Sequence, residues 1–219
     1  MDPDLPAVLA VGFLAQLIDG SLGMAYGVSS TSFLLAIGVP PASASASVHA
    51  AEILTSGVSG LSHYHFGNVS KPLFRRLAVP GVLGGIVGAY LLASFPGQRL
   101  KPYVAAYLLV MGILIVWKAL GRTPEREVTT HIGKLGLAGG FFDAVGGGGW
   151  GPIVTSTLVA RGHNPRITIG SVNLAEFFVT LAQSLTFLLT IGFSHWTIIA
   201  GLILGGVVAA PLAAYASRR

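Results

Sequence analysis

Four acidic side chains lie inside strongly apolar stretches of the 219-residue chain: Asp19, Glu52, Asp143 and Glu176. A carboxyl group is costly to bury in hydrocarbon, so acids in such places are candidates for a functional role. They form two pairs, because Asp143 and Glu176 each follow their counterpart by 124 residues. The match continues without a gap: Gly23, Gly27, Thr31, Ser32, Pro41 and Ser47 recur as Gly147, Gly151, Thr155, Ser156, Pro165 and Ser171. Such a repeat in an apolar chain predicts a membrane transporter built from two structural repeats.

The two glutamates each follow a polar residue by three positions, His49 before Glu52 and Asn173 before Glu176. On a helix this spacing places both side chains of a pair on one face. Proton coupling through His49, Glu52 and Glu176, or contact with a substrate, is one interpretation. The alternative is a neutral, hydrogen-bonded glutamic acid that joins neighbouring helices, and it stays open because buried charge is costly.

Glycine-rich breaks in the helical pattern are predicted to begin at the two aspartates, with Asp19 and Gly20 in the first break and Asp143 in the second. Gly146 to Pro152 exposes successive backbone amides ahead of a helix start, an arrangement that binds anions. The first repeat offers a looser version, in which hydroxyl groups accompany the glycines. The candidate substrate-binding residues are Gly20, Ser21, Gly23, Tyr26, Gly27, Ser29, Ser30, Gly147, Gly148, Gly149, Trp150, Gly151 and Asn173. Close helix packing is the alternative role for the glycines, and Asp19 and Asp143 are predicted to cap the following half-helices.

The composition places these residues in a membrane protein. Hydrophobic residues make up 53% of the chain and charged residues 10%, more apolar side chain than a soluble core of this length buries. Nucleic-acid binding is not expected despite the net charge of +5, because the basic residues lie in short loops between apolar stretches. The chain has no cysteine and no metal-binding motif, so we predict neither a metal site nor a cofactor.

The apolar stretches predict an all-α integral membrane protein with two inverted repeats, each a broken or re-entrant helical hairpin followed by two transmembrane helices. Segments of 10 to 14 apolar residues are too short to span, whereas about 20 suffice. Repeat 1 covers residues 1–100, with its hairpin at 5–38 and spans at 42–66 and 77–95. Residues 101–134 form a linking span and a cytoplasmic loop. Repeat 2 covers 135–219, with its hairpin at 135–161 and spans at 166–191 and 196–216.

The basic residues support the inverted topology. Under it, one side receives Lys71, Arg75, Arg76, Lys118, Arg122, Arg126, Lys134, Arg161, Arg166, Arg218 and Arg219, and the other receives Arg99 and Lys101. Basic residues are enriched in cytoplasmic loops, so this split predicts a cytoplasmic C-terminus and an external N-terminus.

The glycine-rich break before Pro152, the duplicated hairpin and the Asn173-x-x-Glu176 segment resemble the TauE/SafE sulfite exporter family, also called the four-toluene-sulfonate uptake permease family. The resemblance extends from about Leu5 to Ala216. It implies transport of sulfur-containing anions across prokaryotic inner membranes, and it assigns Gly146 to Pro152 to the family's second glycine motif. The first repeat departs from that motif at Gly23 to Gly27.

These observations together predict a secondary transporter of a small sulfur oxyanion, bound between the two breaks. Its partners are the anion and the lipid bilayer, and the oligomeric state is open, a homodimer included. A passive anion channel is the alternative. A membrane subunit or enzyme of sulfur metabolism is a weaker one, because no nucleophile or metal motif accompanies it.

Overall fold

The chain is all-helical within the residues that the computed structural model describes, which are 5–119, 130–193 and 195–216, and these ranges contain no strand. This confirms the predicted all-α class. The elements are α1 (Leu5–Leu22), α2 (Tyr26–Ala36), α3 (Pro41–His65), α4 (Lys71–Ser94), α5 (Gly97–Ala119), α6 (Ile132–Gly146), the π-helical turn η1 (Gly151–Thr155), α7 (Ser156–Ala160), α8 (Pro165–Thr190) and α9 (Trp196–Ala216).

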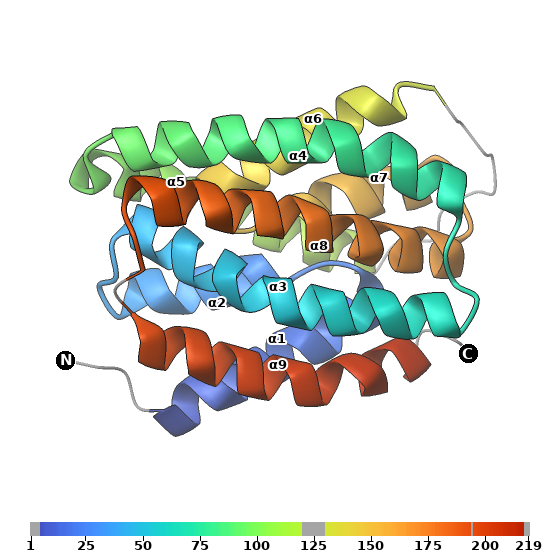
Figure 1. Ribbon diagram of the computed structural model, residues 1–219, viewed down its shortest axis with the longest axis horizontal. Helices are drawn as coiled ribbons and strands as arrows, with labels where there is room; N and C mark the ends of the chain where they lie inside the picture. The colour runs from blue at the N-terminus through green and yellow to red at the C-terminus, as the bar shows by residue number, and fades with distance from the viewer. Residues whose placement is uncertain (1–4, 120–129, 194, 217–219) are drawn as a thin grey trace.

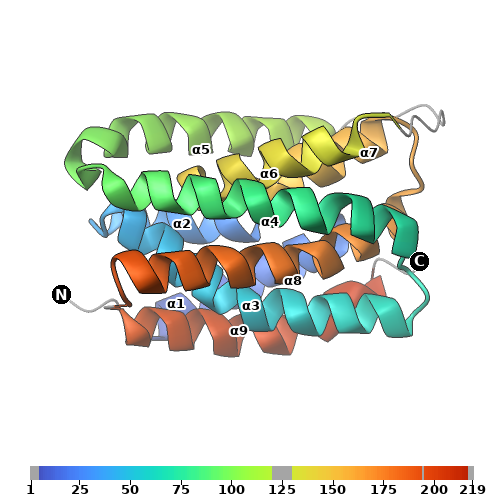
Figure 2. The ribbon, with the colours of Figure 1, turned by 45° about the horizontal axis from the view of Figure 1, so that its top comes forward.

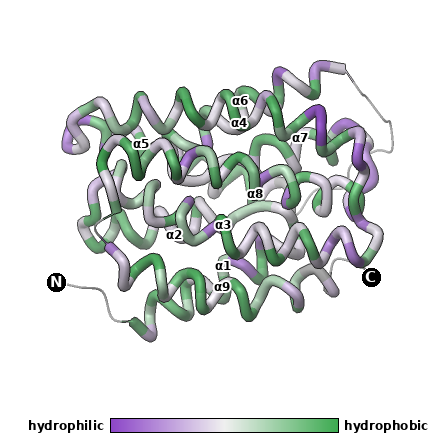
Figure 3. Tube along the Cα trace, in the orientation of Figure 1, coloured by the Kyte–Doolittle hydropathy of each residue, from purple (hydrophilic) through white to green (hydrophobic). Residues whose placement is uncertain are grey.

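Five helices, α1, α4, α5, α8 and α9, are long and apolar enough to cross a bilayer. The protein is therefore a multi-pass membrane protein. Helix α3 has 25 residues but is not among the five, because its buried face is polar. That face carries Ser45, Ser47, His49, Glu52, Thr55, Ser56 and Ser59. Figure 3 shows hydrophilic positions chiefly at the helix ends, with long apolar runs between them.

The long helices lie side by side and pack in matched pairs (Figures 1 and 2). Helix α3 packs against α8, α1 against α9, and α6 against α4. Helix α5 lies at the edge of the bundle, since only 17% of its span is buried, compared with 50% for α8 and α9. The polar face of α3 is thus enclosed by other helices.

Two short helices turn back before crossing the bundle. In Figure 1, α2 returns toward the end where α1 begins, and α7 returns toward the end where α6 begins. The α3–α4 and α7–α8 connections lie at one end, and the α4–α5 and α8–α9 connections lie at the other. The first and last described residues lie at opposite ends.

The break of the first hairpin begins later in the chain than predicted. Helix α1 has 18 residues and continues through Asp19 and Gly20, which were predicted to open the break. The break is confined to Gly23–Ala25, where Gly23 and Ala25 adopt left-handed φ values of 69° and 110°. Gly20 allows α9 to pack closely against this helix: a β-carbon at Gly20 would lie 2.6 Å from that of Ala213.

Helix α4 also begins earlier than expected, at Lys71 rather than Leu77. Lys71, Arg75 and Arg76 therefore belong to its first two turns, not to a loop. Pro72 suits this helix start because its missing N–H would have no partner in the first turn. Of the other basic residues in the charge argument, Arg122, Arg126, Arg218 and Arg219 lie outside the described residues.

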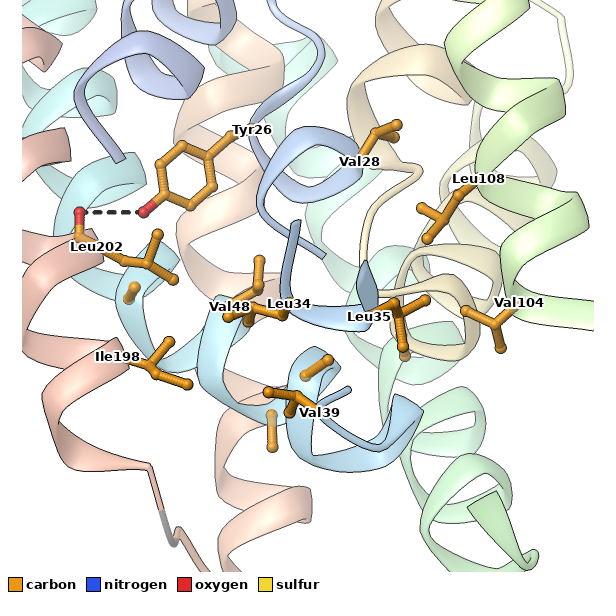
Figure 4. Close-up of a cluster of buried hydrophobic side chains, with 14 of the residues drawn as sticks. Tyr26, Val28, Leu34, Leu35, Val39, Val48, Val104, Leu108, Ile198 and Leu202 are labelled. Carbon is orange, nitrogen blue, oxygen red and sulfur yellow. Dashed lines mark hydrogen bonds between the residues drawn. The ribbon is translucent and has the colours of Figure 1, made fainter. Parts of the chain in front are cut away.

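The half-length helix α2 is held by apolar packing (Figure 4). Its residues Leu34 and Leu35 join a buried cluster that includes Val48 of α3 and Val104 of α5. At its first residue, the Tyr26 hydroxyl donates a hydrogen bond to the Leu202 carbonyl of α9, at 3.2 Å. These contacts fix the start of α2 in the middle of the bundle.

Candidate functional site

The two breaks meet each other directly. A β-carbon at Gly27 would lie 2.6 Å from the Gly148 Cα and 3.0 Å from the Gly147 carbonyl oxygen. One at Gly151 would lie 2.5 Å from the Met24 Cα and would also contact the Gly23 carbonyl. Any side chain at Gly27 or Gly151 would therefore separate the breaks. We call this contact of residues 23–27 with residues 147–151 the crossing.

Two equivalent threonines flank the crossing. The Thr31 hydroxyl donates a hydrogen bond to the Gly147 carbonyl. Its counterpart Thr155 lies beside Gly23, with its hydroxyl oxygen 3.1 Å from the position of a Gly23 β-carbon. The Thr155 hydroxyl is buried and makes no hydrogen bond. One of two equivalent links between the breaks is formed in this conformation.

The carboxylate of Asp143 accepts hydrogen bonds from the backbone amides of the second break. Its Oδ1 atom accepts hydrogen bonds from the amides of Gly149 and Trp150, at 2.8 and 2.9 Å, and its carbonyl accepts one from Gly148. Those amides, predicted to face a substrate, instead hold a carboxylate of the same chain. The segment thus has the chemistry of an anion site and is filled by its own residue. In the first break, the Tyr26 amide is a partner of the Asp19 carboxyl group.

His49 links the polar face of α3 to Asp143. Its Nε2 atom lies 3.1 Å from Asp143 Oδ2, and its Nδ1 atom lies 2.7 Å from the Ser45 carbonyl oxygen. The Gln183 amide nitrogen of α8 also donates to Asp143 Oδ2, at 3.0 Å. Ser45 donates to the Ala144 carbonyl at 2.8 Å. These bonds connect α3, α6 and α8 around one carboxylate.

Glu52 lies between His49 and the crossing. Its Oε2 atom is 3.9 Å from His49 Nε2, beyond hydrogen-bonding distance, and is buried without a partner. Its Oε1 atom would lie 3.2 Å from a β-carbon at Gly27. Glu176, the equivalent residue of α8, is also buried, at 5% exposure. All four predicted acids are therefore enclosed, with Asp19 at 5% and Asp143 at 2% exposure.

The other predicted site residues do not gather in one place but lie in different environments. Ser30, beside the crossing in sequence, is fully buried with an unpartnered hydroxyl. Asn173 donates to Ser59, at 2.8 Å, and keeps its carbonyl oxygen unpartnered. Ser21 donates to the Leu17 carbonyl of its own helix. Ser29 faces an apolar groove of about 1070 Å³ between α2 and α5.

Trp150 was predicted to line the site, but its ring packs among helices. The indole contacts Gly81 of α4 and Gly139 of α6, and its N–H donates to the Val172 carbonyl of α8, at 3.2 Å. The side chain is fully buried within an apolar cluster. Small residues at Gly81 and Gly139 provide the space for this ring.

Two residues near the second break were not predicted. Gln183 binds Asp143, and its position seven residues after Glu176, on the same face of α8, is a usable signal. Tyr107 of α5 packs against Gly146 and Gly149, and its buried hydroxyl has no partner. No sequence signal identifies Tyr107, because only the fold brings α5 to the break. Among the described residues, no group of three His, Asp or Glu side chains has the geometry of a metal site.

Long apolar helices around a sealed polar centre, where two broken hairpins meet, define a multi-pass membrane protein with an internal site. The chain belongs to the sulfite exporter TauE/SafE family, whose sequence profile matches residues 8–219. It is a transmembrane transporter of that family.

A curated relative supports the assignment. The chain is 44% identical over 215 residues to the "Probable membrane transporter protein YtnM" of Bacillus subtilis (strain 168), covering 94% of this chain and 72% of the relative. No solved structure gave a significant match.

Proposed function

We propose that the protein is a secondary transporter of a small sulfur-containing oxyanion, sulfite or an organosulfonate, which binds where the two breaks meet. The observation that carries the proposal is the reciprocal contact of Gly27 with Gly148 and of Gly151 with Gly23. Irregular backbone at membrane depth is tolerated where it is enclosed or lines a wet cavity, and paired helix breaks are a common binding site in transporters.

The chemistry of the second break favours an anion. The amides of Gly149 and Trp150 already hold the Asp143 carboxylate. A substrate anion would bind beside these two amides, where the unpartnered hydroxyls of Ser30, Thr155 and Tyr107 are available. Sulfite as the anion rests on the description of the family. His49, Glu52 and Glu176 are the candidate groups for proton coupling, which is proposed separately from anion transport itself.

Alternating access would come from two inverted halves that rock against each other about the crossing. The matched packing of α1 on α9 and of α6 on α4 supports this symmetry, as do the opposite ends at which the halves begin (Figure 1). We further propose a prokaryotic inner membrane location, with the C-terminus and the α3–α4 connection in the cytoplasm.

Uptake into proteoliposomes tests the transport function. Purified protein should give saturable uptake of sulfite or of a sulfonate, whereas protein-free liposomes should give none. Accumulation against the anion gradient when a pH gradient is applied would exclude a passive channel. Neither uptake nor binding of any anion in a panel of sulfite, thiosulfate and sulfonates would contradict the proposal.

Labelling of single cysteines tests the orientation, since the chain has no cysteine of its own. The two variants are Gln98→Cys, near the start of α5, and Lys71→Cys, at the start of α4. Both replace exposed residues, and the two positions lie at opposite ends of the bundle (Figure 1). In intact cells, a membrane-impermeant maleimide should label the Gln98 variant, and should label the Lys71 variant only after permeabilisation. The reverse pattern would contradict the proposed orientation.

A further inference from the structure

The charges that surround Glu52 are unsuited to an anion that arrives alone. The titratable groups that face Glu52 are His49 from α3, Asp143 from α6, Asp19 from α1, Glu176 from α8 and Tyr26 from α2. Among the buried side chains of the described residues there is no lysine or arginine. Four carboxyl groups, counting Glu52 itself, are thus accompanied by one imidazole in this set. A further negative charge can enter only if a positive charge comes with it.

The hydrogen bonds of His49 fix its protons. The Ser45 carbonyl oxygen can only accept, so Nδ1 of His49 carries a proton and donates it, at 2.7 Å. Nε2 faces Asp143 Oδ2 at 3.1 Å. Asp143 also accepts hydrogen bonds from the backbone amides of Gly149 and Trp150 and from the side-chain nitrogen of Gln183. That nitrogen donates to the Gly140 carbonyl as well, which identifies it as the amide N–H group.

A carboxyl group that faces three other donors is best satisfied as the anion. The second proton then belongs to His49 Nε2, and the pair consists of an imidazolium and a carboxylate. Both partners are almost fully buried, at 0% and 2% exposure. The pair is neutral as a whole, and each of its polar side-chain atoms already has a partner.

Glu52, unlike Asp143, has a side-chain oxygen that receives no hydrogen bond. Its Oε2 atom has no hydrogen-bond partner, and its side chain is 3% exposed. Its Oε1 atom lies beside Gly27, at the point where Gly147 and Gly148 approach. A buried carboxylate without a donor is unfavourable, whereas the neutral acid is tolerated and can donate a hydrogen bond to a bound oxyanion.

We propose that Glu52 takes up one proton together with the substrate anion, so that the two cross the membrane in the same direction, while His49 and Asp143 stay as a fixed ion pair. This inference rests on the proposed function, because it requires an anion at the crossing. Binding of the anion therefore consumes a proton at every pH at which Glu52 is ionised in the free protein. Its affinity falls as pH rises, by about tenfold per pH unit once Glu52 is ionised in the free protein.

The experiment uses methanesulfonate, which stays ionised near neutral pH and so carries no proton of its own. Proteoliposomes with a pH indicator inside receive an inward gradient of the anion, and uptake of the labelled anion is measured in parallel. The native protein should acidify the interior with close to one proton per anion. Its transport should be electroneutral, hence insensitive to a potassium-diffusion potential.

Glu52→Gln mimics the protonated acid but cannot exchange a proton. Proton movement per anion should fall at least tenfold, and the remaining uptake should become sensitive to the membrane potential. Ser56→Ala is the matched control one turn away, where the hydroxyl bonds only to the Glu52 carbonyl of the same helix. This variant should keep the native proton-to-anion ratio.

The outcomes separate the two ideas. Uptake of methanesulfonate by the native protein without acidification would overturn this inference and leave the proposed anion transport intact. Native coupling in Glu52→Gln would assign the proton to Asp19 or Glu176 and would also overturn it. Neither uptake nor binding of methanesulfonate, sulfite or any other anion of the panel would overturn the proposed function, and this inference with it. If Glu52→Gln does not fold, the proton-to-anion ratio of the native protein still decides between coupled and uncoupled transport.

Discussion

His49 Nε2 lies 3.1 Å from Asp143 Oδ2, and this contact joins the long polar helix α3 of the first half to the break of the second. Both side chains are buried, and Asp143 at the same time holds the amides of Gly149 and Trp150. The orientation of α3 and the shape of the second break therefore depend on one carboxylate.

Removal of either member of this pair should destabilise the protein strongly. His49→Gln and Asp143→Asn each leave a buried partner without its counter-charge, so each should lower the free energy of unfolding by ~3 kcal/mol or more. The double variant should lose less than the sum of the two. Denaturant titration in detergent measures all three, and strictly additive losses would show that the two side chains do not interact.

The two equivalent threonines provide a matched comparison. Thr31→Val removes the hydrogen bond to the Gly147 carbonyl and should cost ~1 kcal/mol of unfolding free energy. Thr155→Val removes a hydroxyl that has no partner in this conformation and should be nearly neutral. Thermal unfolding in detergent distinguishes the two. If Thr155→Val is stable but slows uptake, its hydroxyl acts on the substrate or in another conformation. Equal losses of stability would contradict the asymmetry of the crossing.

The crossing should not tolerate a side chain at Gly148. This residue has a φ of 153°, and a β-carbon there would overlap the backbone of Gly27 and Val28. Gly148→Ala should therefore lose at least ~2 kcal/mol of stability, together with uptake. Gly112→Ala is the control, because a β-carbon at this helical position meets nothing within 4 Å and alanine favours the helix. A native-like Gly148→Ala variant would mean that the breaks are less closely packed than described.

Asn68 should be important for the end of the bundle where α3 meets α4. The side-chain oxygen of Asn68 accepts a hydrogen bond from Arg166 of α8, and its side-chain nitrogen donates one to His63 Nδ1, at 3.1 Å. His63 in turn donates to the Gly20 carbonyl of α1, at 3.2 Å. Asn68→Ala leaves the buried His63 ring without a donor and should cost about 1 to 3 kcal/mol. His65→Ala, which replaces an exposed residue of the same helix end, should change the melting temperature little.

The sequence was sufficient to predict the all-helical membrane class, because hydropathy and length are local properties of each segment. It also identified the glycine-rich break, which begins at Gly147, where a left-handed φ of 68° requires a residue without a β-carbon. The start of the first break was predicted wrongly. Asp19 and Gly20 were interpreted as helix breakers, but both lie within α1, where Gly20 leaves room for Ala213 of α9.

The tertiary structure alone decided the partners of these residues. Nothing in the local pattern around Asp143 shows that its carboxylate binds His49, 94 positions away, and Gln183, 40 positions away. Trp150 likewise lies in a polar-looking, glycine-rich segment, yet its ring packs between α4 and α6 because Gly81 and Gly139 make room for it. The repeat determined which residues of the two halves are equivalent. Which of them touch depends on helix contacts between distant segments, and these arise only when the whole bundle has closed around its polar centre.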